Sequence, residues 1–164
     1  MTNNDIIRRI RYMFDFNDSK MIALFRLADH EVTREQISDW LKKDDDPAFQ
    51  EFSDSLLVIF LNGFINDKRG KREGPQPKPE KYLTKNMILR KIKIALSMND
   101  KDILEILDLA RAPISKHELS AFFRKPSHDN YRVCKDQVLR NFLRGMQIKY
   151  KEKKAKVPPS FQQN

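Results

Sequence analysis

Three histidines and one cysteine are the residues best suited to acid–base or nucleophilic chemistry in this chain of 164 residues. An imidazole exchanges protons near neutral pH, and a thiolate attacks electrophiles where a base and a positive environment support it. The one cysteine, Cys134, cannot form an internal disulfide or provide a thiolate cage for zinc. We therefore expect no metal site, and we expect a reducing compartment.

The run Asp44, Asp45 and Asp46 could bind a cation, but it lacks the alternating ligands, central glycine and closing glutamate of a calcium loop. Its expected role is helix capping, since acidic groups near a helix N-terminus are favoured by about 0.3–1 kcal/mol. No Gly-rich phosphate loop is present, and four glycines leave little room for one. The sequence predicts no cofactor.

Basic residues carry a stronger signal. The chain has 32 basic and 23 acidic residues, a formal net charge of +9, which favours polyanionic partners. Residues 1–65 contain 8 basic and 12 acidic residues, whereas residues 66–164 contain 24 and 11. The candidate nucleic-acid contacts in that second part are Lys68, Arg69, Lys71, Arg72, Lys116, Arg124, Lys125, Arg132, Lys135, Arg140 and Arg144.

An internal duplication organises the elements that position these residues. A shift of 82 positions aligns identical residues without a gap over about sixty residues, which is hard to explain by chance. Among the aligned identities are Thr2 with Thr84, Asn4 with Asn86, Leu27 with Leu109, Phe60 with Phe142, and Gly63 with Gly145. The chain therefore contains two copies of one unit.

Each copy is predicted to form four helices, because apolar residues recur at steps of three and four and strand alternation is missing. Polar cap residues precede the first three helices of each copy: Thr2, Asn17 and Thr33, then Thr84, Asn99 and Ser115. The fourth helix is predicted to start after Asp46, with Pro47 in its first turn, or near His128. The predicted fold is all-α, a tandem duplication of a four-helix unit with about eight helices.

The predicted domains are a first helical repeat at 1–65, a basic Pro-rich linker at 66–83, a second repeat at 84–150 and a basic, then frayed, tail at 151–164. A unit of about 65 residues is marginal alone, so the copies should dock on each other. Val58 and Ile59 add an apolar strip where the second copy has Arg140 and Asn141. We expect this strip to meet the other copy or a second subunit.

The duplication also tests the catalytic candidates, because a duplicated active site would often repeat its key residues. None repeats: His30 pairs with Ala112, His117 with Glu35, His128 with Asp46 and Cys134 with Phe52. We therefore expect no enzyme.

Gly63 and Gly145 recur inside helices, where each costs about 1 kcal/mol relative to alanine, and this recurrence predicts close helix packing.

The second and third helices of the second copy could form a helix-turn-helix. Pro113 lies in the turn, and Lys116, His117 and Ser120 lie on the first turns of the helix that would enter a major groove. This order is similar to that of lambda-repressor-like domains. The turn is several residues too long and lacks the usual glycine, so a purely structural helical hairpin remains the alternative.

Three strings point to a family: Arg-Tyr-Met-Phe-Asp at residues 11–15, the segment at 123–132 and the segment at 136–143. With these strings the chain resembles the bacterial YehS-like proteins over nearly everything to about Tyr150. Ser127 departs from the glycine expected there. The resemblance implies the tandem unit and a bacterial, cytoplasmic protein, and it brings no established activity, cofactor or catalytic residue.

The longest apolar run, residues 56–61, is far shorter than the ~20 residues that cross a bilayer, and the N-terminus lacks a signal-peptide pattern. We expect a cytoplasmic protein without membrane contact. The favoured hypothesis is a non-enzymatic module that contacts nucleic acid through the basic second copy. The alternative is a protein-interaction or homo-oligomeric scaffold whose basic face only solubilises.

Overall fold

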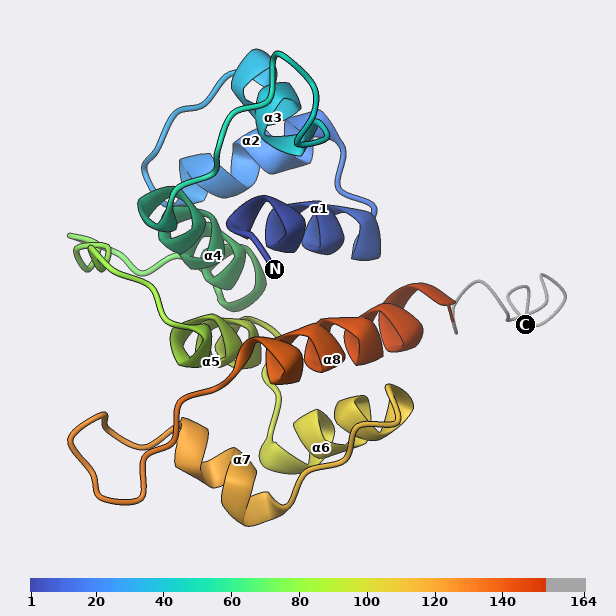
Figure 1. Cartoon of the computed structure of the whole chain (residues 1–164). Coiled ribbons are helices and arrows are strands. Elements are labelled where there is room, and N and C mark those ends of the chain that lie inside the picture. Colours follow the sequence, from blue (N-terminus) through green and yellow to red (C-terminus); the bar gives the residue numbers. More distant parts are fainter. Residues whose placement is uncertain (153–164) are drawn as a thin grey trace, which may run out of the picture. The chain divides into compact units, whose positions relative to one another are not determined.

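The computed structural model describes residues 1–152, which form eight α-helices and no β-strand (Figure 1). The first copy contains α1 (Asn3–Met13), α2 (Asp18–Leu27), α3 (Arg34–Leu41) and α4 (Asp54–Arg69). The second contains α5 (Lys85–Ala95), α6 (Asp100–Leu109), α7 (Lys116–Phe122) and α8 (Asp136–Gln147). The predicted all-α fold of two four-helix copies is confirmed.

The predicted caps of the first three helices are confirmed in both copies. In each, a side-chain oxygen accepts a hydrogen bond from the backbone N–H three residues later, which is worth about 1 kcal/mol. These caps are Thr2, Asn17, Thr33, Thr84, Asn99 and Ser115. Local sequence therefore determines where these six helices begin.

The predicted start of the fourth helix is wrong in both copies. Asp46, Pro47 and His128 lie in the loops that precede α4 and α8. The side chain of Asp46 accepts the N–H of Ala48 and so closes a turn instead of capping a helix. The helix begins later, where Ser53 accepts the N–H of Leu56.

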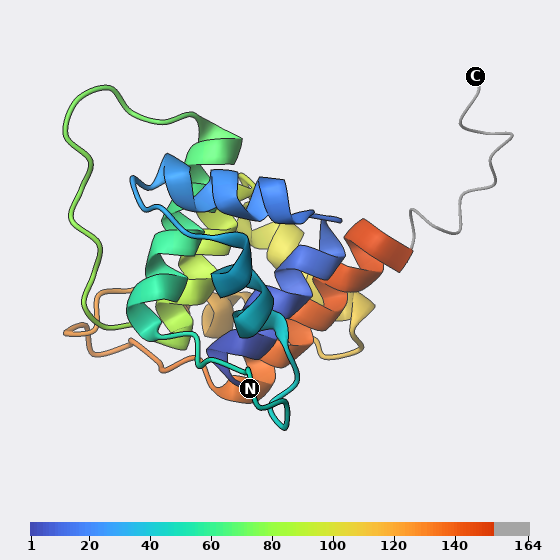
Figure 2. The ribbon, with the colours of Figure 1, turned by 90° about the horizontal axis from the view of Figure 1, so that it is seen from above.

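The linker begins at Gly70, because α4 continues to Arg69, beyond the predicted end of the first repeat. Two contacts with α2 hold this last turn: the Asn66 amide donates to the carbonyl of Leu27 at 2.9 Å, and Asp67 pairs with Lys20 at 2.6 Å. Gly70 ends the helix with a φ of 90°. Figure 2 shows the chain between α4 and α5 as a wide loop.

Two compact units divide the chain, Met1–Met98 and a second unit that begins at Asn99, and they do not coincide with the repeats. The first unit includes α5, the first helix of the second copy, because α5 packs against α4. Lys91 of α5 donates to Asn62 of α4 at 2.7 Å. Val58 lies one turn before Asn62 on the same face of α4, which explains why α4 is apolar there.

The α2–α4 and α6–α8 contacts each depend on a glycine. A Cβ added at Gly63 would lie 1.8 Å from the carbonyl oxygen of Leu24, and one at Gly145 would lie 2.0 Å from that of Ile106. No side chain fits at such distances, so backbone meets backbone at both crossings. The close packing predicted from the recurrent glycines is confirmed.

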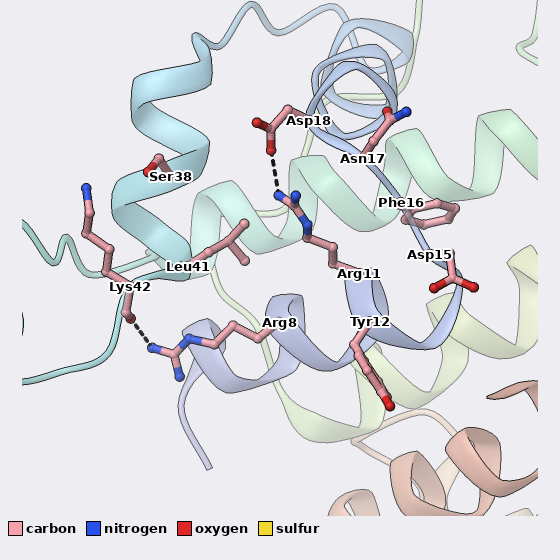
Figure 3. Close-up of a pocket in the computed structure, with 10 residues that line it drawn as sticks. All are labelled: Arg8, Arg11, Tyr12, Asp15, Phe16, Asn17, Asp18, Ser38, Leu41 and Lys42. Carbon is pink, nitrogen blue, oxygen red and sulfur yellow. Dashed lines mark hydrogen bonds and ion pairs between the residues drawn. The ribbon is translucent and has the colours of Figure 1, made fainter. Parts of the chain in front are cut away.

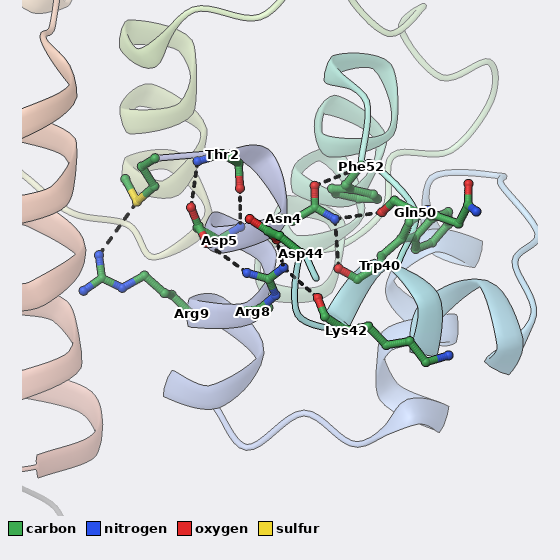
Figure 4. A network of polar contacts seen from close by, with 11 residues as sticks. Thr2, Asn4, Asp5, Arg8, Arg9, Trp40, Lys42, Asp44, Gln50 and Phe52 are labelled. Atoms are coloured by element: carbon green, nitrogen blue, oxygen red, sulfur yellow. Dashed lines mark hydrogen bonds and ion pairs between the residues drawn. The ribbon is translucent and has the colours of Figure 1, made fainter. Parts of the chain in front are cut away.

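A buried amide ties α1 to the loop before α4 (Figure 4). Asn4 is 1% exposed, donates to the carbonyls of Trp40 and Gln50 at 2.9 Å each, and accepts the N–H of Phe52 at 3.0 Å. Its counterpart Asn86 is also buried. Asn4 is therefore a structural clamp, since an unpaired amide at this depth would cost about 1–3 kcal/mol.

The chain after α8 continues as a π-helix, Ile148–Glu152. The remainder of the predicted basic tail, residues 153–164, lies outside the described residues. Within the described part, no helix has the length and apolar character needed to cross a membrane.

Gly63→Ala should destabilise the protein by about 3 kcal/mol, because the forced separation of α2 and α4 outweighs the gain of about 1 kcal/mol in helix propensity. Urea unfolding followed by circular dichroism measures the change. Ser55→Ala, at an exposed position of the same helix, is the control and should change stability by less than about 0.5 kcal/mol. Equal stability of the two variants would contradict the backbone contact.

Arg111→Gly should stabilise the protein by about 0.5–1 kcal/mol. Arg111 follows the end of α6 with a φ of 57°, a left-handed conformation that strains a residue with a Cβ. Its N–H donates to the carbonyl of Asp108, a bond that glycine keeps. Arg111→Ala retains the Cβ and should give no gain, so a similar rise in both variants in thermal unfolding would reject the strain.

Candidate nucleic-acid interface

The loops before α4 and α8 have the same backbone hydrogen bonds. The N–H of Asp46 donates to Lys43 and that of Phe49 to Asp46, at 3.0 Å each. At equivalent positions His128 donates to Lys125 at 2.9 Å and Tyr131 to His128 at 3.0 Å. The two loops, residues 42–53 and 124–135, therefore share one set of backbone hydrogen bonds, which we call the loop frame.

Each loop is also fixed to the helix before it. The N–H of Gln50 donates to the carbonyl of Asp39 at 3.1 Å, and the N–H of Arg132 donates to that of Ala121 at 3.2 Å. These are equivalent bonds, because each joins residues at the 82-residue offset. Side chains on the two loops can therefore be compared position by position.

His128 replaces an aspartate within this frame. Its Nδ1 accepts the N–H of Asn130 at 3.0 Å, as Asp46 Oδ1 accepts the N–H of Ala48 at 2.9 Å. His128 thus organises the loop, a role that its alignment with Asp46 could have revealed. The exchange also removes one negative charge.

The frame carries opposite charge in the two copies. Residues 42–53 contain two basic and four acidic residues, whereas residues 124–135 contain four basic residues and one acidic residue. Because backbone and turns match, the difference lies in the side chains alone. The second loop is a cationic surface whose backbone hydrogen bonds also form in the acidic first loop.

The candidate lysines of the second unit differ from its candidate arginines in their contacts. Among the described residues, the ammonium groups of Lys116, Lys125 and Lys135 have no hydrogen-bond or ion-pair partner, and all three side chains are exposed. They are therefore available to an external anion. The sequence alone does not separate them from the arginines.

The four arginines make contacts within the second unit. Arg124 donates to the carbonyl of Asn130 at 3.2 Å, and Arg132 donates to that of Tyr131 at 3.0 Å. Both therefore brace the loop. On α8 the two other guanidinium groups form ion pairs, Arg140 with Asp136 at 2.5 Å and Arg144 with Glu152 at 2.6 Å. The hydrogen bond from Arg140 lowers the pKa of Asp136.

The start of α8 also differs from that of α4. Ser53 caps α4, but its counterpart Lys135 provides no side-chain hydrogen bond to α8. A lysine at this position is unfavourable twice, since it leaves an N–H without a cap and places positive charge at the positive end of the helix dipole. The second copy therefore has a lysine at the position where Ser53 of the first copy caps and stabilises the helix.

In the predicted helix-turn-helix, α7 would be the helix that enters the major groove, and it is unsuitable for that role. α7 contains seven residues, Leu119, Ala121 and Phe122 are buried, and six residues separate it from α6. His117 is exposed in its first turn beside Lys116. The long connection and the short helix fit the structural hairpin better than a groove-reading helix.

The four basic linker candidates lie in the first unit, apart from the others along the chain. The Lys68 ammonium lies 5.9 Å from the centre of the Phe14 ring, the Arg69 side chain donates to Ser97, and Lys71 pairs with Asp29. The side chain of Arg72 is exposed and has no partner among the described residues. Most of these cations therefore stabilise the end of α4.

The candidate interface strip on α4 is mostly covered. Val58 is fully buried, and Ile59 is partly buried. The helix α4 packs against α1, α2 and α5, so the cover of Val58 lies within the chain. Val58 therefore offers no surface to a second subunit.

A groove of about 650 Å³ lies in the first unit between α1, the loop after it and α3 (Figure 3). Each cation of its lining has a carboxylate partner, in the pairs Arg8–Asp44, Arg11–Asp18 and Lys42–Asp39. These internal pairs leave the groove without the excess charge that an anionic ligand needs. Among residues 1–152, no group of three or more His, Cys, Asp or Glu side chains could hold a metal ion.

A family model described as "Protein of unknown function (DUF1456)" matches residues 3–70 and 85–151, once per copy. The chain is 42% identical over 156 residues to a protein of Escherichia coli (strain K12) described as "Uncharacterized protein YehS". That match covers 94% of this chain and 100% of the relative. No solved structure matches the chain. The resemblance to the YehS-like proteins is confirmed.

Lys135→Ser should stabilise the protein by about 1 kcal/mol, because serine restores the cap that Ser53 provides in the first copy. Chemical unfolding measures the gain. Lys135→Ala removes the same charge without a cap oxygen and is the matched control. If the alanine variant gains as much as the serine variant, the missing cap is not the cause.

Proposed function

We propose that this chain, which belongs to the DUF1456 family of proteins of unknown function, is a non-enzymatic protein that binds nucleic acid through its basic second copy. The supporting observation is the change of charge on the shared loop frame, from two basic and four acidic residues to four basic and one acidic. The backbone hydrogen bonds of the loop form with either charge, and the ammonium groups of Lys125 and Lys135 contact no described residue that would hold the loop. Their accumulation fits an external polyanion.

The three exposed, unpaired lysines strengthen this proposal. Lys116, Lys125 and Lys135 have no charge partner within residues 1–152, so a phosphate would not have to displace one there. Lys135 also occupies a helix cap that a serine would fill with greater stability. A residue that lowers the stability of the protein, at a position where a single substitution would raise it, is typical of a functional position.

We propose no catalytic role, because three of the four catalytic candidates have a structural environment. The His30 ring lies 6.2 Å from that of Phe25, His128 closes a turn, and Cys134 is 1% exposed. A catalytic base must reach a substrate proton, and a reactive thiol must be accessible. The burial of Cys134 and the hydrogen-bonded Nδ1 of His128 do not suit these roles.

A specific observation favours the alternative of a protein-interaction or homo-oligomeric scaffold. Tyr12 and Ile94 occupy equivalent positions of the two copies, and both are exposed, at 55% and 44%. Repeated exposed apolar residues can mark a contact surface. Light scattering over a range of protein concentrations tests this alternative, which requires a dimer or larger species that Tyr12→Ser or Ile94→Ser dissociates.

Fluorescence anisotropy at low salt, with labelled duplex DNA, single-stranded DNA and RNA, tests nucleic-acid binding. Each phosphate contact should contribute about −0.9 to the slope of log K against log salt, so three lysines predict a slope of about −2.7. Absence of binding to every probe would sink the proposal.

Lys125→Ala should weaken binding roughly fivefold and reduce the salt slope by about 0.9. Lys43→Ala is the matched control, because Lys43 is also exposed and its carbonyl also accepts the first hydrogen bond of the loop. Anisotropy should show no change for this variant. Equal losses in the two variants would mean that overall charge, and not the second loop, determines binding.

A further inference from the structure

We infer that the loop at residues 124–135 binds the phosphate backbone of a double-stranded nucleic acid and reads no base sequence. This inference rests on the proposed function and specifies its ligand. In Figure 1 the loop runs out from the ends of α7 and α8 as an extended excursion. Its exposed segment, residues 125–130, has no helical structure.

Sequence readout in a duplex needs an element that enters a groove and presents about three or four side chains to base edges. α7 cannot supply them. Its exposed residues are Lys116, His117 and Glu118, and the Glu118 carboxylate accepts the N–H of Ser115 at the helix start. Two side chains on one turn are too few for a recognition helix.

Single-stranded nucleic acids are held by aromatic side chains on which bases stack, together with a basic surface. Among the described residues of the second unit, no Phe, Tyr or Trp side chain is exposed. The large apolar residue that is exposed there, Val133 at 67%, has no ring. The described surface of the second unit therefore has the basic residues of a single-strand binding site but no exposed aromatic ring on which a base could stack.

Phosphate binding to a duplex needs only cations held at a stable position. The loop provides this rigidity through the turn bonds of His128 and the anchor from Arg132 to Ala121. Arg124 braces the loop from within, whereas Lys125 and Lys135 are exposed and their ammonium groups have no partner in the part of the chain that the structure describes. Contacts of this kind fix a protein on the duplex and carry no sequence information.

Competition anisotropy with the full chain and a labelled duplex DNA of about 20 base pairs tests the inference. Unlabelled duplexes of unrelated sequence should compete within about threefold of one another, and a mixed-sequence single strand should compete at least about tenfold more weakly. Duplex RNA is included, and the tighter of the two duplexes identifies the source of the phosphates.

Two variants of His128 separate loop charge from loop structure. His128→Asn and His128→Asp both keep an oxygen that can accept the N–H of Asn130, as Asp46 does in the first copy. Only the aspartate adds a negative charge. His128→Asp should therefore bind the duplex roughly tenfold more weakly than His128→Asn, with equal melting temperatures.

Lys125→Glu provides a second test if the His128→Asp variant is unstable, because Lys125 contacts the loop through its backbone carbonyl. It should weaken duplex binding at least about tenfold. Failure to bind any nucleic acid would reject the proposed function itself. Differences above about 100-fold between duplex sequences, tighter binding of the single strand, or equal affinity of the His128→Asp and His128→Asn variants would reject only the inference.

Discussion

The approach of α4 to α2 and of α8 to α6 is the constraint on which the structure depends. At both crossings a glycine lets one helix meet a carbonyl oxygen of the other, Leu24 in the first copy and Ile106 in the second. A propensity cost of about 1 kcal/mol at each glycine is outweighed by the packing of apolar residues around it. The fully buried Phe60 and Phe142 lie on these helices, which therefore carry the centre of each copy.

The backbone hydrogen bonds of the loops before α4 and α8 allow the side chains of the two loops to differ. Their backbone is held by turn bonds, an anchor to the preceding helix and, in the first copy, the buried amide of Asn4. None of these bonds needs a particular charge on the exposed residues. One loop could therefore become acidic and the other basic without a change of fold, and even the side-chain bond of Asp46 was replaced by that of His128.

The basic surface divides into two classes of cation. Arg124 and Arg132 donate to loop carbonyls, which suits a planar guanidinium with several donors in fixed directions. Lys125 and Lys135 have flexible stems, and no described residue pairs with their ammonium groups. The arginines thus hold the surface and the lysines present its charge. This division explains why an overall net charge of +9 says little about which residues meet a ligand.

The sequence by itself determined the duplication, the helical class and six helix starts, because identity at one offset, apolar period and cap residues are local properties. It also located the excess charge. Tertiary structure decided where α4 and α8 begin, that Val58 is buried, and which cations among residues 1–152 remain unpaired. These outcomes depend on groups far apart in the chain, such as Asn4 with Gln50 or Lys91 with Asn62. A pattern of neighbouring residues does not encode such contacts, since long-range packing and hydrogen bonding can override a local signal such as Asp46 followed by Pro47.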